Sequence, residues 1–249
     1  MTPAFKAWGE EMKKAGKIKY FGFSTHTNMA DCLLGAARLD WIDAIMLTYN
    51  FRLVNDPKMV EAVSACTKAG IGLVAMKTMG GGPGMPKTES PGELKVAERF
   101  LQRGFTQAQA KLKVVWENPA MASICSQMPN LTILSANVAA ARDQTKLSQG
   151  DMDALQQYAQ ETRADYCAGC GHICQTAVDG AAPIPEVMRC LMYYRDYGEP
   201  GLAREIFASL PLAARRRLTR VDYSQAEQAC PQGLAIADLM RQAAEILAS

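Results

Sequence analysis

The sequence lacks the long hydrophobic runs and the strong charge excess that mark two large classes of protein. No apolar stretch approaches the roughly 20 residues that a membrane-spanning helix needs. The 27 basic residues nearly balance the 25 acidic residues, which gives a net charge of +2. This balance offers no electrostatic reason to expect nucleic acid or an anionic membrane as a partner.

The start of the sequence also lacks the apolar core of a secretory signal peptide. It carries Phe5, Trp8 and Met12 at helical spacing instead, which predicts an amphipathic helix. We expect a cytoplasmic protein by default, although this chain does not identify the compartment, because any targeting peptide would precede it.

Short apolar segments alternate with helical patterns in the first 150 residues. Strands are predicted at residues 19–24, 44–50, 71–77 and 121–127, and helices at 29–38, 57–69, 94–117 and 131–141. This alternation predicts parallel strands covered by helices, the α/β class. From the pattern alone, the sheet is either doubly wound and open or part of a barrel. No Gly-x-Gly-x-x-Gly follows the first strand, which argues against a Rossmann fold.

The eight cysteines fall into two groups. Cys32, Cys66 and Cys125 are scattered through apolar stretches of the first half, where small buried thiols are common. The other five lie between residues 167 and 230, in a region that predicts helices. That region opens on Ser148-x-x-Asp151, a capping box for a helix reaching to about residue 163.

The stretch "CAGCGHIC" places three of these cysteines within eight residues. Cys167, Cys170 and Cys174 are separated by two and three residues, and the glycines between them permit the positive φ angles of a loop around a compact centre. Zinc ribbons usually supply two separated Cys-x-x-Cys pairs. Three cysteines in one loop with a distant Cys-Pro favour a [4Fe–4S] cluster, whose fourth ligand is then Cys230. Pro231, which follows Cys230, is expected at the start of a helix, where its missing N–H costs nothing.

Two other residues compete for a place on this cluster. Cys190 shares a predicted core-facing helical stripe with Val187, Leu191 and Tyr194, so we prefer Cys230 as the fourth ligand. His172 lies inside the cysteine loop, but a neutral imidazole is a poorer partner for this cluster than a thiolate. A zinc site and a redox disulfide remain alternatives.

Several segments resemble the aldo/keto reductase family. "AGKIKYFGFSTHT" resembles the family's fifth strand, "LTYNF" its sixth, "VAMKTMGGG" its seventh, and "QAKLKVVWENPAMASICSQM" its seventh helix and eighth strand. "YCAGCGHIC", "PIPEVMRCLMYYRDYGE" and "AEQACPQGLAIADLM" look like pieces of a ferredoxin-like iron–sulfur domain that follows the barrel in some members. The resemblance identifies the chain as the C-terminal part of such a protein, with a C-terminal ferredoxin-like 4Fe–4S domain.

The resemblance implies a fold and a division into domains. We expect strands five to eight, the second half of a (β/α)₈ TIM barrel, over residues 1–145, and a small all-α 4Fe–4S domain over residues 146–249. In the family, the catalytic Asp, Tyr, Lys and His come from earlier strands, so no catalytic residue is assigned. We therefore expect this chain to be a fragment that lacks the catalytic tetrad.

The resemblance also implies a nicotinamide site at the carboxyl ends of the strands. Ser24 and Thr25 would face the carboxamide, and Met76 and Lys77 would lie beside the ring. The remaining expected contacts are Gly80 and Gly81 at the pyrophosphate and Gln127, Met128 and Asn137 along the adenosine. No Lys or Arg follows the last strand to pair a 2′-phosphate. NAD(P)H binding is therefore expected to be weak or lost.

These observations leave two main functions open. One is an aldo/keto reductase type oxidoreductase with one [4Fe–4S] cluster for electron relay or structural support. Its partners in full-length form would be a nicotinamide cofactor and a small carbonyl substrate. The other is a non-catalytic iron–sulfur module, and a zinc-stapled interaction domain is a distant third. The redox partner is unknown, and open barrel edges predict self-association.

Overall fold

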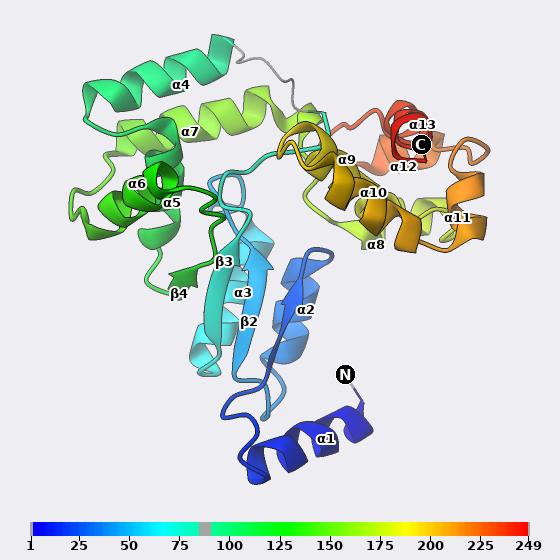
Figure 1. The fold of residues 1–249 in the computed structure, drawn as a ribbon, viewed down its shortest axis with the longest axis horizontal. Helices are drawn as coiled ribbons and strands as arrows, with labels where there is room; N and C mark the ends of the chain where they lie inside the picture. Colours follow the sequence, from blue (N-terminus) through cyan, green and yellow to red (C-terminus); the bar gives the residue numbers. More distant parts are fainter. Residues whose placement is uncertain (1, 85–90, 249) are drawn as a thin grey trace. The chain divides into compact units, whose positions relative to one another are not determined.

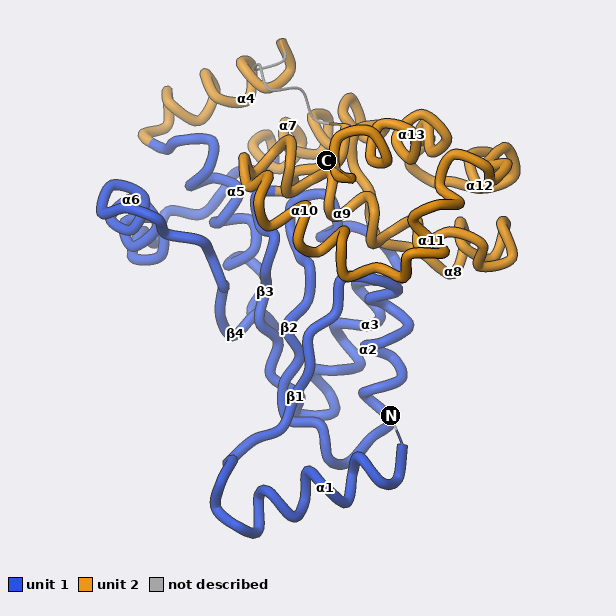
Figure 2. The backbone as a smooth tube through the Cα atoms, turned by 45° about the vertical axis from the view of Figure 1, so that its right-hand side comes forward, with its two compact units in different colours: residues 1–79, 105–149 blue, residues 80–104, 150–249 orange. Residues whose placement is uncertain are grey.

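The computed structural model describes residues 2–84 and 91–248, and their elements alternate between strand and helix before becoming entirely helical (Figure 1). The chain forms two compact units (Figure 2). The first contains residues 1–79 and 105–149, and the second contains residues 80–104 and 150–249. Each unit is described by itself below. None of the described helices is long and apolar enough to cross a membrane.

The first unit is built on a parallel sheet with strand order β1-β2-β3-β4. The strands are β1 (Gly22–Thr25), β2 (Ala44–Thr48), β3 (Gly72–Met76) and β4 (Met121–Ile124). Side chains alternate between the two faces of the sheet. One face of the sheet is fully buried and carries Ile45, Leu47 and Leu73. The opposite face is only partly covered.

Most helices of this unit begin at a residue whose side chain caps the first turn. The helices of the unit are α1 (Pro3–Lys14), α2 (Met29–Ala36), α3 (Pro57–Lys68), α5 (Gln107–Trp116) and α6 (Leu131–Arg142). The Asp56 side chain caps α3 by accepting from the N–H of Met59 at 2.9 Å, and Thr106 and Gln109 form a capping box at α5. The α2 and α3 side chains Leu33, Ala62 and Cys66 complete the core beneath the sheet.

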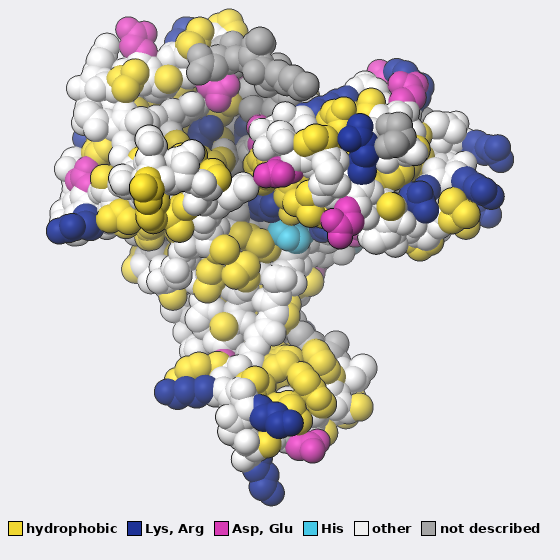
Figure 3. Space-filling view, viewed as in Figure 1, with side chains coloured by type: hydrophobic (Ala, Val, Ile, Leu, Met, Phe, Trp, Pro, Cys, Tyr) yellow, Lys and Arg dark blue, Asp and Glu magenta, His cyan; other side chains and the backbone are white. Residues whose placement is uncertain are grey.

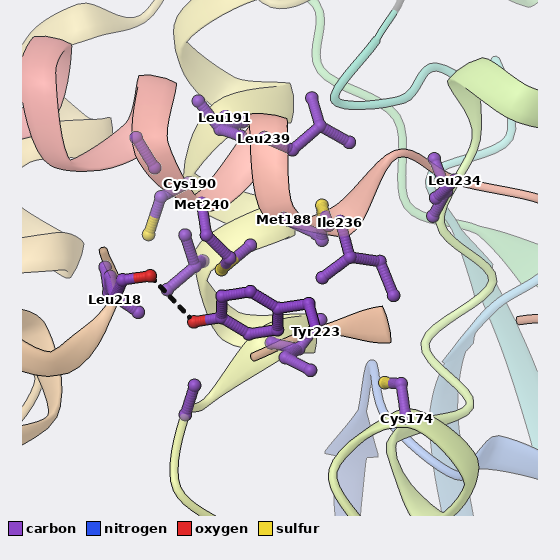
Figure 4. Packing of buried hydrophobic residues seen from close by; sticks show 14 of the residues in the cluster. Cys174, Met188, Cys190, Leu191, Leu218, Tyr223, Leu234, Ile236, Leu239 and Met240 are labelled. Atoms are coloured by element: carbon purple, nitrogen blue, oxygen red, sulfur yellow. Dashed lines mark hydrogen bonds between the residues drawn. The ribbon is translucent and has the colours of Figure 1, made fainter. Parts of the chain in front are cut away.

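The second unit is helical throughout its described residues. Its helices are α4 (Pro91–Gln102), α7 (Gln149–Glu161), α8 (Gly171–Cys174), α9 (Ile184–Arg195), α10 (Pro200–Ser209), α11 (Leu212–Arg217), α12 (Ser224–Ala229) and α13 (Ile236–Leu247), with 3₁₀ turns η1 (Arg163–Asp165) and η2 (Thr176–Val178). Its main core joins α8 to α13 and contains Cys174, Met188 and Cys190 (Figure 4). Tyr223 lies in this core and donates its hydroxyl proton to the carbonyl of Leu218 at 3.0 Å.

The predicted elements are confirmed to within a few residues. All four strands form, the N-terminal amphipathic helix is α1, and the helix predicted after Ser148 is α7. Residues 85–90, between the third predicted strand and the helix predicted from residue 94, lie outside the described residues. The predicted domain boundary at residues 145 and 146 stays a prediction.

The predicted fold class is wrong in its finer part. The four parallel strands belong to an α/β fold of the (β/α) barrel type that starts near the N-terminus of this chain, rather than to a second half with strands five to eight. The prediction failed because every strand–helix unit of a barrel has the same hydrophobic pattern, so a local pattern cannot number the strands. The ferredoxin-like domain expected after them is likewise not supported.

Candidate functional site

The carboxyl ends of the four parallel strands lie at one end of the sheet, where sites of α/β proteins form. Thr25 is in register with Leu47, which is in register with Ala75, and Thr48 is in register with Met76 one residue further along. The Thr25 hydroxyl donates to the carbonyl of Thr27 at 2.9 Å, which turns the chain after β1. The strands therefore bring Thr25 and Met76 to the same end of the sheet.

The chain turns sharply after β3, at Lys77. This residue has a φ of +57°, in the left-handed region that residues with a Cβ seldom adopt. Asn50, which is completely buried, donates from Nδ2 to the Lys77 carbonyl at 3.1 Å and accepts from the N–H of Arg52 at 3.0 Å. The buried amide thus joins the end of β2 to the strained turn at Lys77.

Asn50 and Thr78 are buried polar residues that the sequence reasoning missed. The signal was present in "LTYNF" and "MKTMG", where a polar residue interrupts an apolar strand end, because a buried polar group needs hydrogen-bond partners there. The imidazole Nδ1 of His26 lies 3.3 Å from the Thr48 hydroxyl, so this loop histidine also belongs to the strand ends.

Tyr49 is a structural residue at this end of the sheet. Its hydroxyl accepts a hydrogen bond from Asn118 Nδ2 at 2.8 Å, and its ring is almost fully buried. Burial raises the pKa of the Tyr49 hydroxyl, although the bond from Asn118 opposes the shift. The hydroxyl therefore stays protonated at neutral pH and ties β2 to the segment before β4.

The residues predicted along the adenosine lie after β4 and on α6. Asn137 donates from Nδ2 to the Ser126 hydroxyl at 3.1 Å, which draws the end of β4 toward α6. Gln127 and Met128 are exposed beside them. Ser24 is also exposed, on the partly covered face of the sheet. The structure thus gathers Gln127, Met128 and Asn137 in one segment, while their role with a cofactor stays a prediction.

The two predicted pyrophosphate glycines belong to the second unit. Gly80 has a φ of +68°, so it needs the conformational freedom of glycine. A Cβ added at Gly81 would lie 1.7 Å from a carboxylate oxygen of Asp196, and one at Gly82 would lie 2.1 Å from the carbonyl oxygen of Asp165. The groups that lie close to Gly81 and Gly82 are Asp196 and Asp165 of the same unit, and the approach of Gly80 and Gly81 to a pyrophosphate stays a prediction.

The cysteine loop lies between η1 and α8. Cys167 and Cys170 precede α8, and Cys174 is its last residue. Gly169 has a φ of +75°, as the sequence predicts, whereas Gly171 simply begins α8. Cys174 is in the main core of the unit, and Cys167 packs against that core.

Cys230 comes to the same core from the end of α12. The chain turns there through a hydrogen bond from the N–H of Gly233 to the Cys230 carbonyl at 3.1 Å. The prediction that Pro231 begins a helix is wrong, because the next helix, α13, starts only at Ile236. Pro231 therefore belongs to a turn, a role for which its fixed φ is equally suited.

The four predicted ligands are close enough to influence one another electrostatically. Burial raises the pKa of the Cys167 thiol to about 12, and proximity to Cys170, Cys174 and Cys230 adds to the shift. Burial likewise raises the pKa of Cys174 to about 11, with smaller contributions from Cys170 and Cys230. A backbone hydrogen bond from Gly169 opposes the shift at Cys167 by favouring the thiolate. The thiol of Cys167 is thus influenced by the other three cysteines.

Cys190 has a different environment. It is completely buried in α9, and burial raises its pKa to about 11, with further effects from Arg189 and Glu186.

His172 is exposed on α8, where its carbonyl accepts from the Thr176 hydroxyl at 2.7 Å. Within residues 2–84 and 91–248, no three His, Cys, Asp or Glu side chains are grouped closely enough to hold a single metal ion.

Comparison with known proteins identifies the first part of the chain. The sequence profile of the aldo/keto reductase family matches residues 7–158, which is more than half of the chain. The chain belongs to the aldo/keto reductase family. No curated protein matches the chain.

Solved structures of the family are similar but cover the chain only in part. An aldose reductase from Giardia lamblia is 22% identical over 64% of this chain and 50% of its own, with a TM-score of 0.47. An aldo-keto reductase from Bacillus halodurans is 19% identical over 60% and 54%, with a TM-score of 0.45. One from Klebsiella pneumoniae in complex with NADPH is 18% identical over 59% and 50%, with a TM-score of 0.45. The chain thus spans about half the length of these proteins.

The family match corrects the interpretation of the resemblance. The aldo/keto reductase domain occupies residues 7–158, the N-terminal part of this chain, and no comparison found a ferredoxin-like domain. The prediction of a C-terminal part that ends in a ferredoxin-like 4Fe–4S domain is therefore wrong. That prediction was based on short cysteine and helix motifs in the second half of the chain. Such motifs specify only local geometry, so they do not identify a domain by themselves.

Proposed function

We propose that this aldo/keto reductase family protein is a nicotinamide-dependent oxidoreductase that carries one [4Fe–4S] cluster on Cys167, Cys170, Cys174 and Cys230. The cluster relays electrons or supports the helical unit. We further propose a small carbonyl compound as substrate, a cytoplasmic location, and self-association through the open edges of the sheet.

The observation that carries the cluster proposal is the packing of cysteines from two distant segments, Cys167 with Cys174 and Cys230, in or against one core. Residues 56 positions apart in sequence, Cys174 and Cys230, each raise the pKa of Cys167, and three of the four cysteines belong to or pack against one core. Isolated structural thiols are buried singly, as Cys66 is in the first unit. Four thiols that converge from two distant segments favour a shared ligand.

The donor set fits an iron–sulfur cluster better than a single zinc ion. Zinc holds its thiolates about 2.3 Å from the metal, so their sulfur atoms stand roughly 3.8 Å apart. A [4Fe–4S] cluster is several atoms across and holds its four thiolates farther apart. Three soft thiolates from one loop and a fourth from the distant Cys-Pro match that donor set.

When bound, such a cluster supplies one-electron chemistry. The residues of this chain would hold and insulate it. The N–H of Gly169 toward the Cys167 sulfur favours the thiolate form and would tune a bound cluster. Buried apolar residues of the same core, such as Val178 and Leu234, restrict the access of water.

The nicotinamide proposal is supported by family membership and by the strand ends. Ser24, Thr25, Met76 and Lys77 lie on or directly after β1 and β3, where a ring would bind in a barrel-type fold. The contacts proposed for the rest of the cofactor are Gly80, Gly81, Gln127, Met128 and Asn137. The segment 126–137 contains no Lys or Arg to pair a 2′-phosphate, so we propose weak NADPH binding. No catalytic residue is proposed.

A non-catalytic iron–sulfur module is the second candidate. It is favoured because all four cysteines lie in the second unit, whose core is separate from that of the sheet. Such a site needs nothing from the first unit. A carbonyl reductase assay with NADH and NADPH separates the two candidates, since only the oxidoreductase turns over.

The cluster itself is tested by anaerobic purification of the full chain. We expect a broad absorbance near 400 nm with about four iron and four sulfide per chain, as for one [4Fe–4S] cluster. Zinc without iron or sulfide would replace the proposal with a structural zinc site. Protein free of both metals after reconstitution with iron and sulfide would refute any metal role for these cysteines.

A further inference from the structure

The glycine-rich segment at residues 81–84, called the glycine segment below, lies against the backbone that enters the cysteine loop. Both belong to the second unit. A Cβ added at Gly82 would lie 2.1 Å from the carbonyl oxygen of Asp165 and 2.8 Å from Cα of Tyr166. The N–H of Gly84 donates to the same Asp165 carbonyl at 3.2 Å. The two backbones therefore touch without a side chain between them.

The glycine segment is also in contact with the end of α9. Arg195 donates from Nη1 to the carbonyl of Pro83 at 2.8 Å, and its guanidinium also bonds to a glutamine side chain of α13. A Cβ added at Gly81 would lie 1.7 Å from a carboxylate oxygen of Asp196. The end of α9 thus fixes the segment that contacts the start of the cysteine loop.

The cysteine loop depends on such contacts for its position. Residues 166–170 form neither helix nor strand, and Gly169 has a φ of +75°. Tyr166 is 3% exposed and directly precedes Cys167. An irregular loop has few backbone hydrogen bonds of its own, so the groups that pack against it decide how easily it opens.

The cysteines differ in how the fold holds them. Cys174 is the last residue of α8, and Cys230 directly follows α12. Cys167 comes before α8, in the irregular part of the loop. Of these three, Cys167 is therefore the residue whose position depends most on contacts from outside the loop.

We infer that the glycine segment positions the cysteine loop, and with it Cys167, for cluster binding. Glycine is needed at position 82 because two backbones touch there, and Arg195 holds the segment from α9. Neither residue is a ligand, so both are positioning residues. The inference rests on the cluster proposed above, and it gives Gly82 and Arg195 a role that the proposed nicotinamide contacts do not include.

Thiol labelling of the metal-free full chain tests the inference. In the folded protein without urea, labelling of Cys167 reports opening of the loop, whereas labelling of Cys190 in α9 reports unfolding of the core. Gly82→Ala forces the two backbones apart and is expected to speed Cys167 labelling about tenfold without urea. Peptide mass spectrometry measures the two cysteines separately.

A structural role alone would give a different result. If Gly82→Ala lowers the unfolding midpoint while Cys167 keeps its wild-type labelling rate, the segment stabilises the fold without positioning the loop, and the inference is refuted. Gly201→Ala is the control, since a methyl group there would meet nothing within 4 Å. Its Cys167 labelling rate should match that of the wild type.

A second variant tests the hold from α9 without adding atoms. Arg195→Ala removes the hydrogen bond to the Pro83 carbonyl and should also speed Cys167 labelling, by a smaller factor than Gly82→Ala. Its control is Arg216→Ala, because Arg216 is exposed on α11, where Figure 3 shows basic side chains at the surface. Equal labelling rates in the two arginine variants would refute the role of Arg195.

The cluster-bound protein gives an independent measurement. Gly82→Ala should lose iron to a chelator about tenfold faster than the wild type, since residues that orient a ligand affect metal affinity by that order. Gly201→Ala should lose iron at the wild-type rate. A wild-type chain that binds no cluster would refute the proposed function, whereas the labelling rates would still decide whether the segment positions the loop. The two failures are therefore distinguishable.

Discussion

The Asp151 carboxylate accepts a hydrogen bond from Nε of Arg99 at 2.9 Å, which joins α7 to α4 within the second unit. Asp151 is completely buried, and Arg103 also bonds to its other oxygen. Both arginines remain partly exposed, so water reaches them but not the carboxylate. The pair of arginines therefore compensates a charge that would be costly to bury alone.

Removing both arginines should strongly destabilise the protein. Arg99→Ala with Arg103→Ala leaves the buried carboxylate without a partner, which costs about 3–5 kcal/mol. Adding Asp151→Asn to that double variant should recover part of the loss, because no charge is then buried. Urea unfolding of the three proteins measures the difference.

Arg241→Ala is the control for this network. Arg241 pairs with Asp238 and Glu245 on the exposed face of α13, where ion pairs contribute little. Its urea midpoint should not change measurably. An equal loss in Arg241→Ala and in the double variant would show that burial of Asp151 is not the cause.

Close packing at Gly82 gives a second prediction. A methyl group there would lie 2.1 Å from the Asp165 carbonyl oxygen and 2.8 Å from Cα of Tyr166, both backbone atoms that cannot move aside easily. Gly82→Ala should therefore cost about 1–3 kcal/mol by overpacking, measured as a lower midpoint of thermal unfolding.

Gly201→Ala is the matched control in the same unit. Gly201 lies in the first turn of α10, and a methyl group there would meet nothing within 4 Å. Alanine also favours helix over glycine, so this variant should be neutral or slightly stabilised. The prediction for Gly82 fails if the two variants unfold at the same temperature.

The sequence predicted what depends on local pattern and missed what depends on distant partners. The alternation of apolar segments located all four strands, and the cap at Ser148 located the start of α7. The capping motif predicted a role for Asp151 at the start of the helix and missed its ion pairs. Arg99 and Arg103 are 52 and 48 residues away in sequence, so no local pattern indicates that they bind Asp151.

The candidate site shows the same division. Their spacing predicted that the three cysteines of one loop act together, and the Cys-Pro pair predicted Cys230 as the fourth. The prediction of a helix start at Pro231 was wrong, because a turn follows Cys230. The glycines after β3 lie close to Asp165 and Asp196, which the sequence pattern could not reveal because these residues belong to the helical unit far along the chain. Their predicted approach to a pyrophosphate stays a prediction. Strand numbering failed because barrel units repeat the same pattern.

Cys66 gives a prediction about alkaline pH. The thiol is completely buried beneath the sheet and its Sγ lies 3.4 Å from the Leu33 carbonyl, to which it donates. Burial raises the pKa of Cys66 from 9.0 to about 11. The fold thus favours the neutral thiol. Its contribution to stability is complete below pH 9 and is lost as the pH rises from 9 to 11.

The measurement compares wild type with Cys66→Ala by urea unfolding at pH 8 and at pH 10.5. The difference in unfolding free energy between them should shrink by roughly 2 kcal/mol over that interval, at 1.36 kcal/mol per pKa unit. Effects of other groups cancel in the comparison. A constant difference would mean that the Cys66 thiolate is tolerated in the fold.

The choice of the fourth cluster ligand can be decided by one pair of variants. Cys230 packs beside the cysteine loop and raises the pKa of Cys167 and Cys174, whereas Cys190 lies inside α9 and interacts with Arg189 and Glu186. Cys230→Ala should therefore abolish the absorbance near 400 nm and the bound sulfide.

Cys190→Ala should keep the cluster while losing stability, because it removes a fully buried sulfur from the core and leaves a small cavity. A lowered unfolding midpoint with intact absorbance is the expected signature. Cys230→Ala should show the opposite signature, with lost absorbance and a fold that circular dichroism still reports as helical. The assignment of Cys230 is refuted if Cys190→Ala loses the cluster and Cys230→Ala retains four iron per chain.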